Sequence, residues 1–189
     1  MQTQLPHTVR LIGGKYRGKQ LTVLQAPGLR PTPDRVRESI FNLIGSKVEG
    51  AQVLDLFAGS GALGLEAISR GARSLVLVEN SAENCDLLSA EIRHFKGEQI
   101  KLVQQDALTF LQQCSTQFDV VFLDPPYGAK LLEPALNLLN ARALIKPSSI
   151  LYVEMSSATR TIVPGFEIIR EQTAGQVKFG LWRQSSFLF

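Results

Sequence analysis

From residue 51 onward, short apolar runs alternate with longer segments whose apolar residues recur at helical spacing. The apolar runs cover residues 52–57, 74–79, 99–104, 118–123 and 150–154, and the helical segments cover residues 62–70, 82–95, 107–114 and 130–139. The runs are rich in Val, Leu and Phe, as strands buried on both faces are. This alternation predicts a parallel, doubly wound α/β sheet, whose ligands bind beyond the carboxyl ends of the strands where strand order reverses.

The C-terminal part of the chain has a different pattern. Residues 166–172 and 176–184 form two extended segments joined by Thr173, Ala174 and Gly175, which leaves no room for a helix. They predict a closing antiparallel hairpin. A Rossmann-type dehydrogenase would continue with a helix and another parallel strand, so this ending favours the methyltransferase variant of the fold. We therefore expect a Rossmann-like, mostly parallel seven-stranded sheet that ends in an antiparallel hairpin.

The N-terminal part precedes the alternating pattern. Residues 8–12 and 20–24 flank a glycine-rich, basic loop and predict a small β-hairpin. A linker with several prolines follows at residues 27–33, and a helix is predicted at 34–44, with Asp34 suited to its N-cap. We accordingly divide the chain into a basic hairpin with its linker, residues 1–33, and a catalytic domain, residues 34–189.

Charge changes the picture only in this N-terminal part. The whole chain of 189 residues carries a formal net charge of +3, yet no acidic residue precedes Asp34. A one-signed arm on an otherwise balanced domain indicates a polyanionic partner, although a solvated basic surface would have the same composition. The basic side chains before Asp34 are Arg10, Lys15, Arg17, Lys19 and Arg30.

Composition otherwise excludes several classes. Hydrophobic residues make up 44% of the chain, and no apolar run is as long as a membrane span, so we expect a soluble, cytoplasmic protein without a membrane partner. Cys85 and Cys114 have no ligand spacing, and His7 and His94 are far apart in sequence. We therefore expect reduced structural thiols and no metal site.

A glycine-rich turn follows the first core strand and opens a helix. Gly59 and Gly61 permit a sharp turn and close backbone approach to a ligand, and Gly64 lets the helix pack tightly on the sheet. The spacing alone would also suit a dinucleotide. However, Asp55 would repel a pyrophosphate and attract an ammonium group, and Glu79, at the end of the second strand, can accept both ribose hydroxyls. A zwitterionic amino-acid nucleoside therefore fits better.

The tetrapeptide at residues 124–127 ends the fourth strand and faces the same edge of the sheet. Pro125 and Pro126 hold the backbone rigid and, lacking N–H groups, leave carbonyl acceptors without local donors. An exocyclic amine needs such acceptors, because they favour a geometry that frees its delocalised lone pair. Asp124 and the Pro125 carbonyl are the candidate acceptors, and Tyr127 would stack on a flipped-out base. A rigid strand-to-loop turn is the purely structural alternative.

Residues 55–61 closely resemble the first motif of class I methyltransferases, which implies S-adenosylmethionine as cofactor. By this resemblance, Asp106 accepts from the adenine amino group and Ala107 helps to read the ring edge. The structural alternative for Asp106 is a plain helix N-cap, and both roles could hold together. The tetrapeptide at 124–127 resembles the signature of methyltransferases acting on amino groups of adenine, guanine, cytosine or glutamine. The resemblance implies a cofactor site made by Asp55, Phe57, Ala58, Gly59, Ser60, Gly61, Glu79, Asn80, Asp106 and Ala107.

A narrower resemblance covers nearly the whole chain. Residues 11–19, 28–32, 34–38 and 174–177 are similar to blocks of the bacterial 16S ribosomal RNA (guanine-N2)-methyltransferase family of the small ribosomal subunit. This resemblance implies methylation of a specific guanine in 16S rRNA, within a small-subunit particle, by a monomeric enzyme. The expected RNA contacts are Arg10, Lys15, Arg17, Lys19, Arg30, Arg35 and Arg37, although Arg37 could instead pair with Asp34 or Glu38.

Three alternatives remain open from the sequence. A DNA or RNA adenine-N6 methyltransferase shares the tetrapeptide, but the chain leaves little room for a target-recognition domain. A protein-glutamine methyltransferase would resemble Asn-Pro-Pro-Tyr and carry a helical N-terminal domain. A non-enzymatic assembly factor that only binds the cofactor would be free to lose Asp124 and Tyr127, which are both present.

Overall fold

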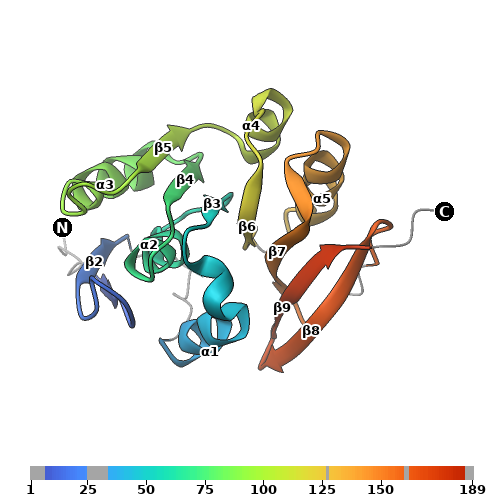
Figure 1. Ribbon diagram of the computed structural model, residues 1–189, viewed down its shortest axis with the longest axis horizontal. Helices are drawn as coiled ribbons and strands as arrows, with labels where there is room; N and C mark the ends of the chain where they lie inside the picture. The colour runs from blue at the N-terminus through green and yellow to red at the C-terminus, as the bar shows by residue number, and fades with distance from the viewer. Residues whose placement is uncertain (1–6, 25–33, 127, 160–161, 186–189) are drawn as a thin grey trace.

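A seven-stranded sheet forms the centre of the computed structural model, which describes residues 7–24, 34–126, 128–159 and 162–185 (Figure 1). The strand order is β5-β4-β3-β6-β7-β9-β8, with β3 to β7 parallel and β9 antiparallel to both β7 and β8. This topology confirms the predicted fold class. The strands are β3 (Gln52–Asp55), β4 (Ser74–Glu79), β5 (Ile100–Gln104), β6 (Phe118–Leu123), β7 (Ile145–Ser156), β8 (Phe166–Ala174) and β9 (Val177–Gln184).

Helices cover both faces of this sheet, because successive strand residues point to opposite sides. Val53 belongs to the core under α1, α2 and α3, whereas its neighbour Leu54 belongs to the core under α4 and α5 (Figure 1). Strand order reverses between β3 and β6, as the sheet pattern predicts for a ligand site. The helices are α1 (Asp34–Ile44), the 3-10 turn η1 (Gly45–Val48), α2 (Ala62–Ser69), α3 (Ala82–Ile92), α4 (Ala107–Gln113) and α5 (Leu132–Ala141).

Strand β7 begins five residues earlier than predicted, at Ile145 rather than residue 150. Pro147 interrupts the apolar pattern, and a proline ordinarily argues against a central strand. The register shifts between Phe118 and Val120, so an irregularity in the ladder accommodates the extra residues. Ser149 stabilises this bend, since its hydroxyl donates to the Phe118 carbonyl at 2.7 Å and accepts from the Lys146 N–H at 2.9 Å.

The predicted N-terminal hairpin forms from β1 (His7–Arg10) and β2 (Gln20–Val23) and packs against α2 and α3. Its main anchor is the carboxylate of Glu66, which is fully buried in the middle of α2. Glu66 accepts the N–H groups of Ile12 and Gly13 at 2.8 Å each, and the Nε–H of Arg70 also at 2.8 Å. A buried charge is tolerated when it is paired and hydrogen-bonded in this way.

Side chains of the following turn extend this contact. The Tyr16 N–H donates to the Ser69 hydroxyl at 2.9 Å, and the Tyr16 hydroxyl donates to Glu98, also at 2.9 Å. The Tyr16 ring packs on Phe95 with 4.6 Å between centroids. From the second strand of the hairpin, the Thr22 N–H donates to Glu91 at 2.9 Å. The hairpin is therefore anchored to the helical layer along its whole length.

Replacing Glu66 should weaken this attachment strongly. Glu66→Ala leaves two backbone N–H groups and the Arg70 guanidinium without their acceptor, so we expect a loss of about 3 kcal/mol in unfolding free energy. Urea denaturation followed by circular dichroism measures this change. Glu83→Ala is the matched control, because Glu83 is exposed in the first turn of α3 and should change stability by less than about 1 kcal/mol. Equal effects of the two substitutions would contradict the anchoring role of Glu66.

Candidate active site

Four carboxylates gather where the parallel strands end. Asp55 is the last residue of β3 and Glu79 the last residue of β4, while Asp124 directly follows β6. Glu154 lies near the end of β7, and because Leu123 pairs with Val153, it is in register with Asp124. The strands on both sides of the β3/β6 switch point thus each contribute an acid.

Asp55 is the most deeply placed of these acids, with 2% of its surface exposed. Burial raises its pKa to about 7, and the negative charge of Glu79 contributes in the same direction. The Gly64 N–H donates to Asp55 at 3.0 Å and partly offsets this rise. Near neutral pH Asp55 therefore stands at the midpoint of its titration.

Asp124 is partly exposed to solvent as a residue, yet the surrounding protein desolvates its carboxylate. This burial raises its pKa well above the usual range, and the charges of Glu154 and then Asp55 raise it further. Among the described residues, no ion pair joins Asp55, Glu79 or Asp124 to a basic side chain. The strand ends therefore form an acidic site that a bound cation would stabilise.

The predicted glycine turn lies directly over this site. Gly59 and Gly61 both have left-handed backbones, with φ of 51° and 71°, and Gly61 caps α2. Gly64 brings α2 against the sheet, because a Cβ there would lie 2.8 Å from the Leu77 side chain, as the sequence predicts. Glu79 accepts from the Gly59 N–H at 2.8 Å.

Glu79 is also held from its other side, by the Ser81 N–H at 2.7 Å. Backbone donors on both oxygens fix the carboxylate at the end of β4, where the sequence predicts contact with ribose hydroxyls. Phe57 and Ser60 are partly exposed on the turn, Ala58 is buried, and Asn80 is exposed beside Glu79. These positions leave the predicted cofactor contacts together at one edge of the sheet.

Asp106 and Ala107 begin α4, beyond the end of β5. The Asp106 carboxylate accepts from the Thr109 N–H at 2.9 Å and from its hydroxyl at 3.0 Å, so the alternative role as N-cap is the one found. Asp106 is exposed and Ala107 is buried. Contact of either residue with an adenine stays a prediction.

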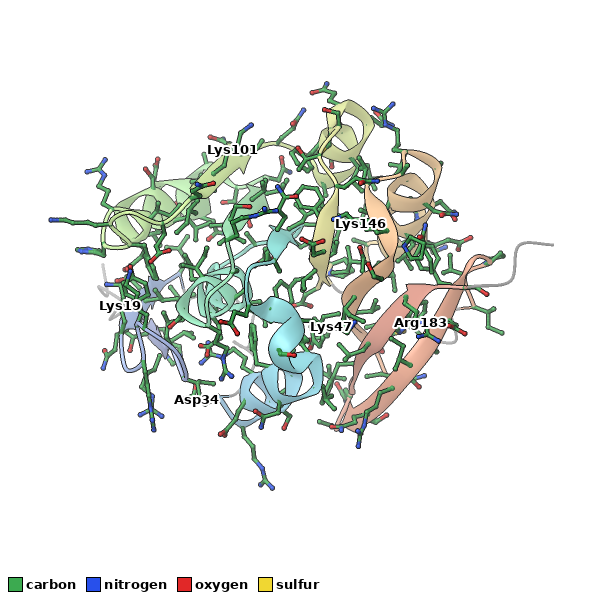
Figure 2. All side chains as sticks on the ribbon, viewed as in Figure 1. Lys19, Asp34, Lys47, Lys101, Lys146 and Arg183 are labelled. Atoms are coloured by element: carbon green, nitrogen blue, oxygen red, sulfur yellow. The ribbon has the colours of Figure 1, made fainter. Side chains whose placement is uncertain are left out.

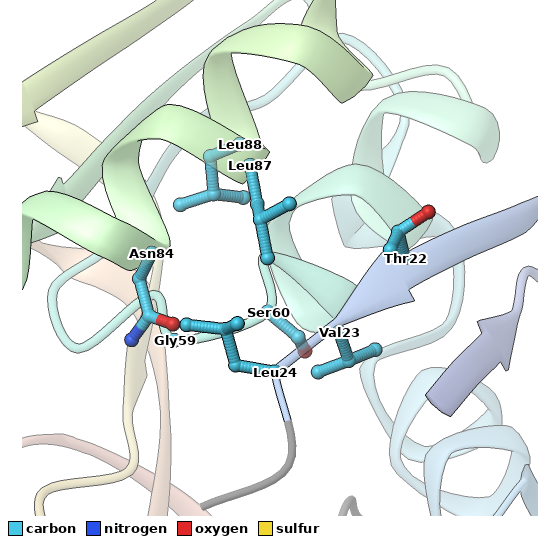
Figure 3. Close-up of a pocket in the computed structure, with 8 residues that line it drawn as sticks. All are labelled: Thr22, Val23, Leu24, Gly59, Ser60, Asn84, Leu87 and Leu88. Atoms are coloured by element: carbon cyan, nitrogen blue, oxygen red, sulfur yellow. The ribbon is translucent and has the colours of Figure 1, made fainter. Parts of the chain in front are cut away.

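The end of the hairpin reaches the cofactor turn. Thr22, Val23 and Leu24 line a small hollow together with Gly59 and Ser60 of the turn (Figure 3). Its other wall is α3, from which Asn84, Leu87 and Leu88 complete the lining. The N-terminal hairpin therefore lies beside the turn that the sequence assigns to the cofactor.

A larger cavity of about 330 Å³ opens beside the turn that follows Asp124. Its walls are the Pro125–Pro126 turn, the segment leading into α5, and the end of β7 with Glu154. Pro125 is partly exposed and Pro126 is exposed, so the predicted acceptor turn faces solvent and the cavity. Tyr127 lies outside the described residues. The space suits a planar ring of the size of a purine.

The predicted RNA-contacting side chains fall into different environments. Arg17 and Arg35 are exposed. Lys15 forms an ion pair with Glu98 at 2.7 Å. The Lys19 ammonium lies over the ring of Phe95, and Figure 2 labels Lys19 at the hairpin. Arg30 lies outside the described residues.

Arg37 requires a correction, because it is fully buried rather than on the surface. Its guanidinium donates to the Asp34 carboxylate at 2.7 Å and to the Arg10 carbonyl at 2.6 Å. Asp34 is the first residue of α1 and also pairs with Arg10 at 3.2 Å (Figure 2). The sequence offered pairing with Asp34 as the alternative to RNA contact, and the structure has this pairing. Arg37 is buried because it lies on the apolar face of α1, which packs inward.

Sequence reasoning missed Glu66 and Glu154. Both lie inside apolar segments that predict core helix and core strand, and their spacing gives no motif. The available signal was a single acid in each buried run, which burial makes costly without a partner.

Comparison with known proteins identifies the family. The family model described as "Conserved hypothetical protein 95" matches residues 9–183. The ribosomal RNA small subunit methyltransferase D of Escherichia coli K12 is 39% identical over 180 residues, covering 94% of this chain and 91% of the relative. The chain belongs to this family. The protein of the same name from Haemophilus influenzae is also 39% identical, covering 93% of both chains.

The fold agrees with that membership. A solved structure from Escherichia coli with a provisional methyltransferase name superimposes with a TM-score of 0.86 at 39% identity, covering 96% of this chain and all of the other. Because the chain belongs to the methyltransferase D family, the two alternative enzyme classes, adenine-N6 and protein-glutamine methyltransferases, are not favoured. In the part of the chain that the structure describes, no helix is long and apolar enough to cross a membrane, and no cluster of three or more metal-ligating side chains is found.

S-adenosylmethionine is the cofactor, and the acidic site suits it. The molecule carries two cations, a sulfonium and an ammonium, whereas the strand ends hold carboxylates whose pKa values are raised by burial and by the negative charges of neighbouring acids. Asp55 would attract the ammonium, and Glu79 would accept the ribose hydroxyls. The left-handed Gly59 and Gly61 let the backbone approach without a side chain in the way.

Cofactor affinity should therefore depend on pH. Binding a cation beside Asp55 requires its proton to leave, so affinity should rise by up to about tenfold per unit as pH rises to about 7 and then level off. Calorimetric titration from pH 5.5 to 8.5 measures this dependence and the released proton. Asp55→Asn should weaken binding and remove the change near pH 7.

The same substitution provides its own folding control. Because the folded pKa of Asp55 is above the unfolded value, the ligand-free protein loses stability as pH rises from about 4 to 7. Asp55→Asn keeps an acceptor for Gly64 and should melt at a higher temperature than the parent protein at pH 8. A lower melting temperature would mean that Asp55 is structural and its titration unimportant.

Proposed function

We propose that this protein transfers a methyl group from S-adenosylmethionine to the exocyclic N2 amine of a guanine in 16S rRNA, within a small-subunit particle. The observation that carries the proposal is the place of Asp124. It directly follows β6 among the acidic strand ends, and it directly precedes Pro125, which lines a cavity of purine size. An amine bound at the Pro125 end of that cavity would lie close to the acceptor carboxylate and to the proposed cofactor site.

The chemistry then divides between cofactor and chain. When bound, the cofactor supplies an electrophilic methyl group on a sulfonium sulfur. Asp124 and the Pro125 carbonyl accept the two N–H bonds of the amine, which holds the nitrogen and favours the geometry in which its lone pair is free. Asp124 then receives the proton that the methylated amine loses, and its raised pKa makes it a stronger base for this step.

The basic hairpin supports an RNA substrate. Arg10, Lys15 and Arg17 are exposed on it, and Lys19 is partly exposed, so their positive charge faces solvent. The loop that carries Lys15 and Arg17 lies at the C-terminal end of α2, where the Lys15 N–H donates to the Ser69 carbonyl at 2.7 Å. Contacts of this kind position a phosphate backbone and carry no base specificity. A monomeric enzyme acting in the cytoplasm agrees with this proposal.

The direct test supplies unmodified small-subunit particles and radiolabelled S-adenosylmethionine, followed by mass mapping of the labelled nucleotide. We expect a single N2-methylguanine. Label in an adenine, in protein, or in no product at all would contradict the proposal.

Asp124→Ala should abolish this transfer. Loss of the acceptor and base should lower kcat by roughly 10³-fold or more, whereas the dissociation constant of the cofactor should change by less than about tenfold. Single-turnover methylation and calorimetry measure the two quantities separately. Parallel loss of methylation and cofactor binding would show that Asp124 serves the cofactor site and not the amine.

Replacing Lys15, Arg17 and Lys19 together by Ala should weaken RNA binding and flatten its dependence on salt. Up to three phosphate contacts are lost, so the slope of log K against log salt concentration should fall by roughly 2 units. Filter binding between 50 and 300 mM KCl measures the slope. A slope equal to that of the parent protein would remove the hairpin from the RNA surface.

A further inference from the structure

The cavity beside Asp124 contains a buried carboxylate that the proposed methyl transfer does not use. Glu154 has 7% of its surface exposed, and it nevertheless lines the cavity together with Pro125 and Pro126. A second acid so close to Asp124 raises the pKa of that carboxyl, which is an unfavourable arrangement in the free protein. A buried acid at a cavity, whose charge disfavours ionisation of a neighbouring acid, is a candidate for a functional residue.

Glu154 is held in a fixed position. The Tyr152 hydroxyl donates to its Oε2 at 2.8 Å, and Tyr152 is almost fully buried. The Tyr152 ring is packed against Phe122, with 6.1 Å between centroids, and against Phe179, at 6.4 Å. This aromatic support limits the rotamers of Tyr152 and hence the direction in which the Glu154 carboxylate can point. A binding group that is preorganised in this way loses little entropy when it meets its ligand.

The strand register adds the decisive juxtaposition. Since Leu123 pairs with Val153, Asp124 and Glu154 leave neighbouring strands at the same level, and Pro125, directly after Asp124, lines the cavity with Glu154. Ionised carboxylates accept hydrogen bonds and do not donate them. When both are ionised, the two side chains present adjacent acceptors, which match a ligand with adjacent donors.

We propose that Glu154 determines base specificity by accepting the N1–H of the target guanine while Asp124 accepts from the neighbouring N2 amine. This inference rests on the proposed guanine methylation. A guanine offers these two donors side by side on its Watson–Crick edge. Adenine and cytosine instead have a ring nitrogen with a lone pair next to the amine, and Glu154 would repel it.

The substitution Glu154→Gln tests this role, because it keeps the size of the side chain and removes the charge. We expect methylation of small-subunit particles to fall by about 100-fold or more in kcat/KM, with the dissociation constant of the cofactor changed by less than about threefold. Glu49→Gln is the matched control. Glu49 is exposed after η1 and before the start of β3, at the edge of the sheet opposite the site, and its replacement should change kcat/KM by less than about twofold.

A binding measurement separates recognition from a purely structural role. Saturation-transfer NMR on the enzyme loaded with S-adenosylhomocysteine compares GMP, 1-methyl-GMP and AMP as probes. The parent protein should bind GMP about tenfold more tightly than either of the others, and Glu154→Gln should lose this preference. Glu49→Gln should retain it.

Three results would overturn the inference. These are equal binding of GMP and 1-methyl-GMP by the parent protein, an unchanged preference in Glu154→Gln, and full methylation by that variant. The nucleotide comparison on the parent protein decides the matter even if Glu154→Gln fails to fold. Failure of the proposed function is distinguishable, because mass mapping with the parent protein would then find the methyl group on something other than guanine.

Discussion

Repulsion among the carboxylates at the strand ends is the constraint around which the site is organised. A parallel sheet brings the ends of β3, β4, β6 and β7 to one edge, so acids at those positions come together. The fold supplies neutral donors to hold them, such as the Gly64 N–H for Asp55 and the Tyr152 hydroxyl for Glu154. These donors fix the direction of the carboxylates, and the charge of buried Asp55 would be compensated by a bound cation. Part of the stability of the free protein is thereby given up for binding.

Helix α2 links the two halves of the proposed function. Its N-terminus is the Gly61 turn over the cofactor site, and its middle carries Glu66, which anchors the hairpin. The second strand of the hairpin returns to that turn, where Leu24 and Gly59 line one hollow. The surface proposed to bind RNA and the loop proposed to hold the cofactor therefore rest on the same helix.

Much of this architecture follows from local pattern. Burial on both faces makes the β-strands continuous apolar runs, and the residues 124–127 stand out because two prolines are incompatible with a continuing ladder. Local pattern did not identify the buried acids Glu66 and Glu154 as functional or anchoring residues. Glu66 finds its partners more than fifty positions away in sequence, and Arg37 is buried because α1 packs inward. Such pairings depend on tertiary docking, which neither periodicity nor composition encodes. The predicted start of β7 was wrong for a related reason, since a strand can include Pro147 here only because its register with β6 is irregular.

The attachment of the hairpin to Glu66 also sets an order of events during synthesis. The hairpin leaves the ribosome first, but its anchor lies in a helix that is made more than fifty residues later. At the usual 5–20 residues per second, the basic segment stays undocked for several seconds. Contacts between segments so distant in sequence form late, because the intervening chain must first lose its freedom. The basic segment therefore becomes part of the folded domain only after α2 has formed, and until then its charge is not held against the helical layer.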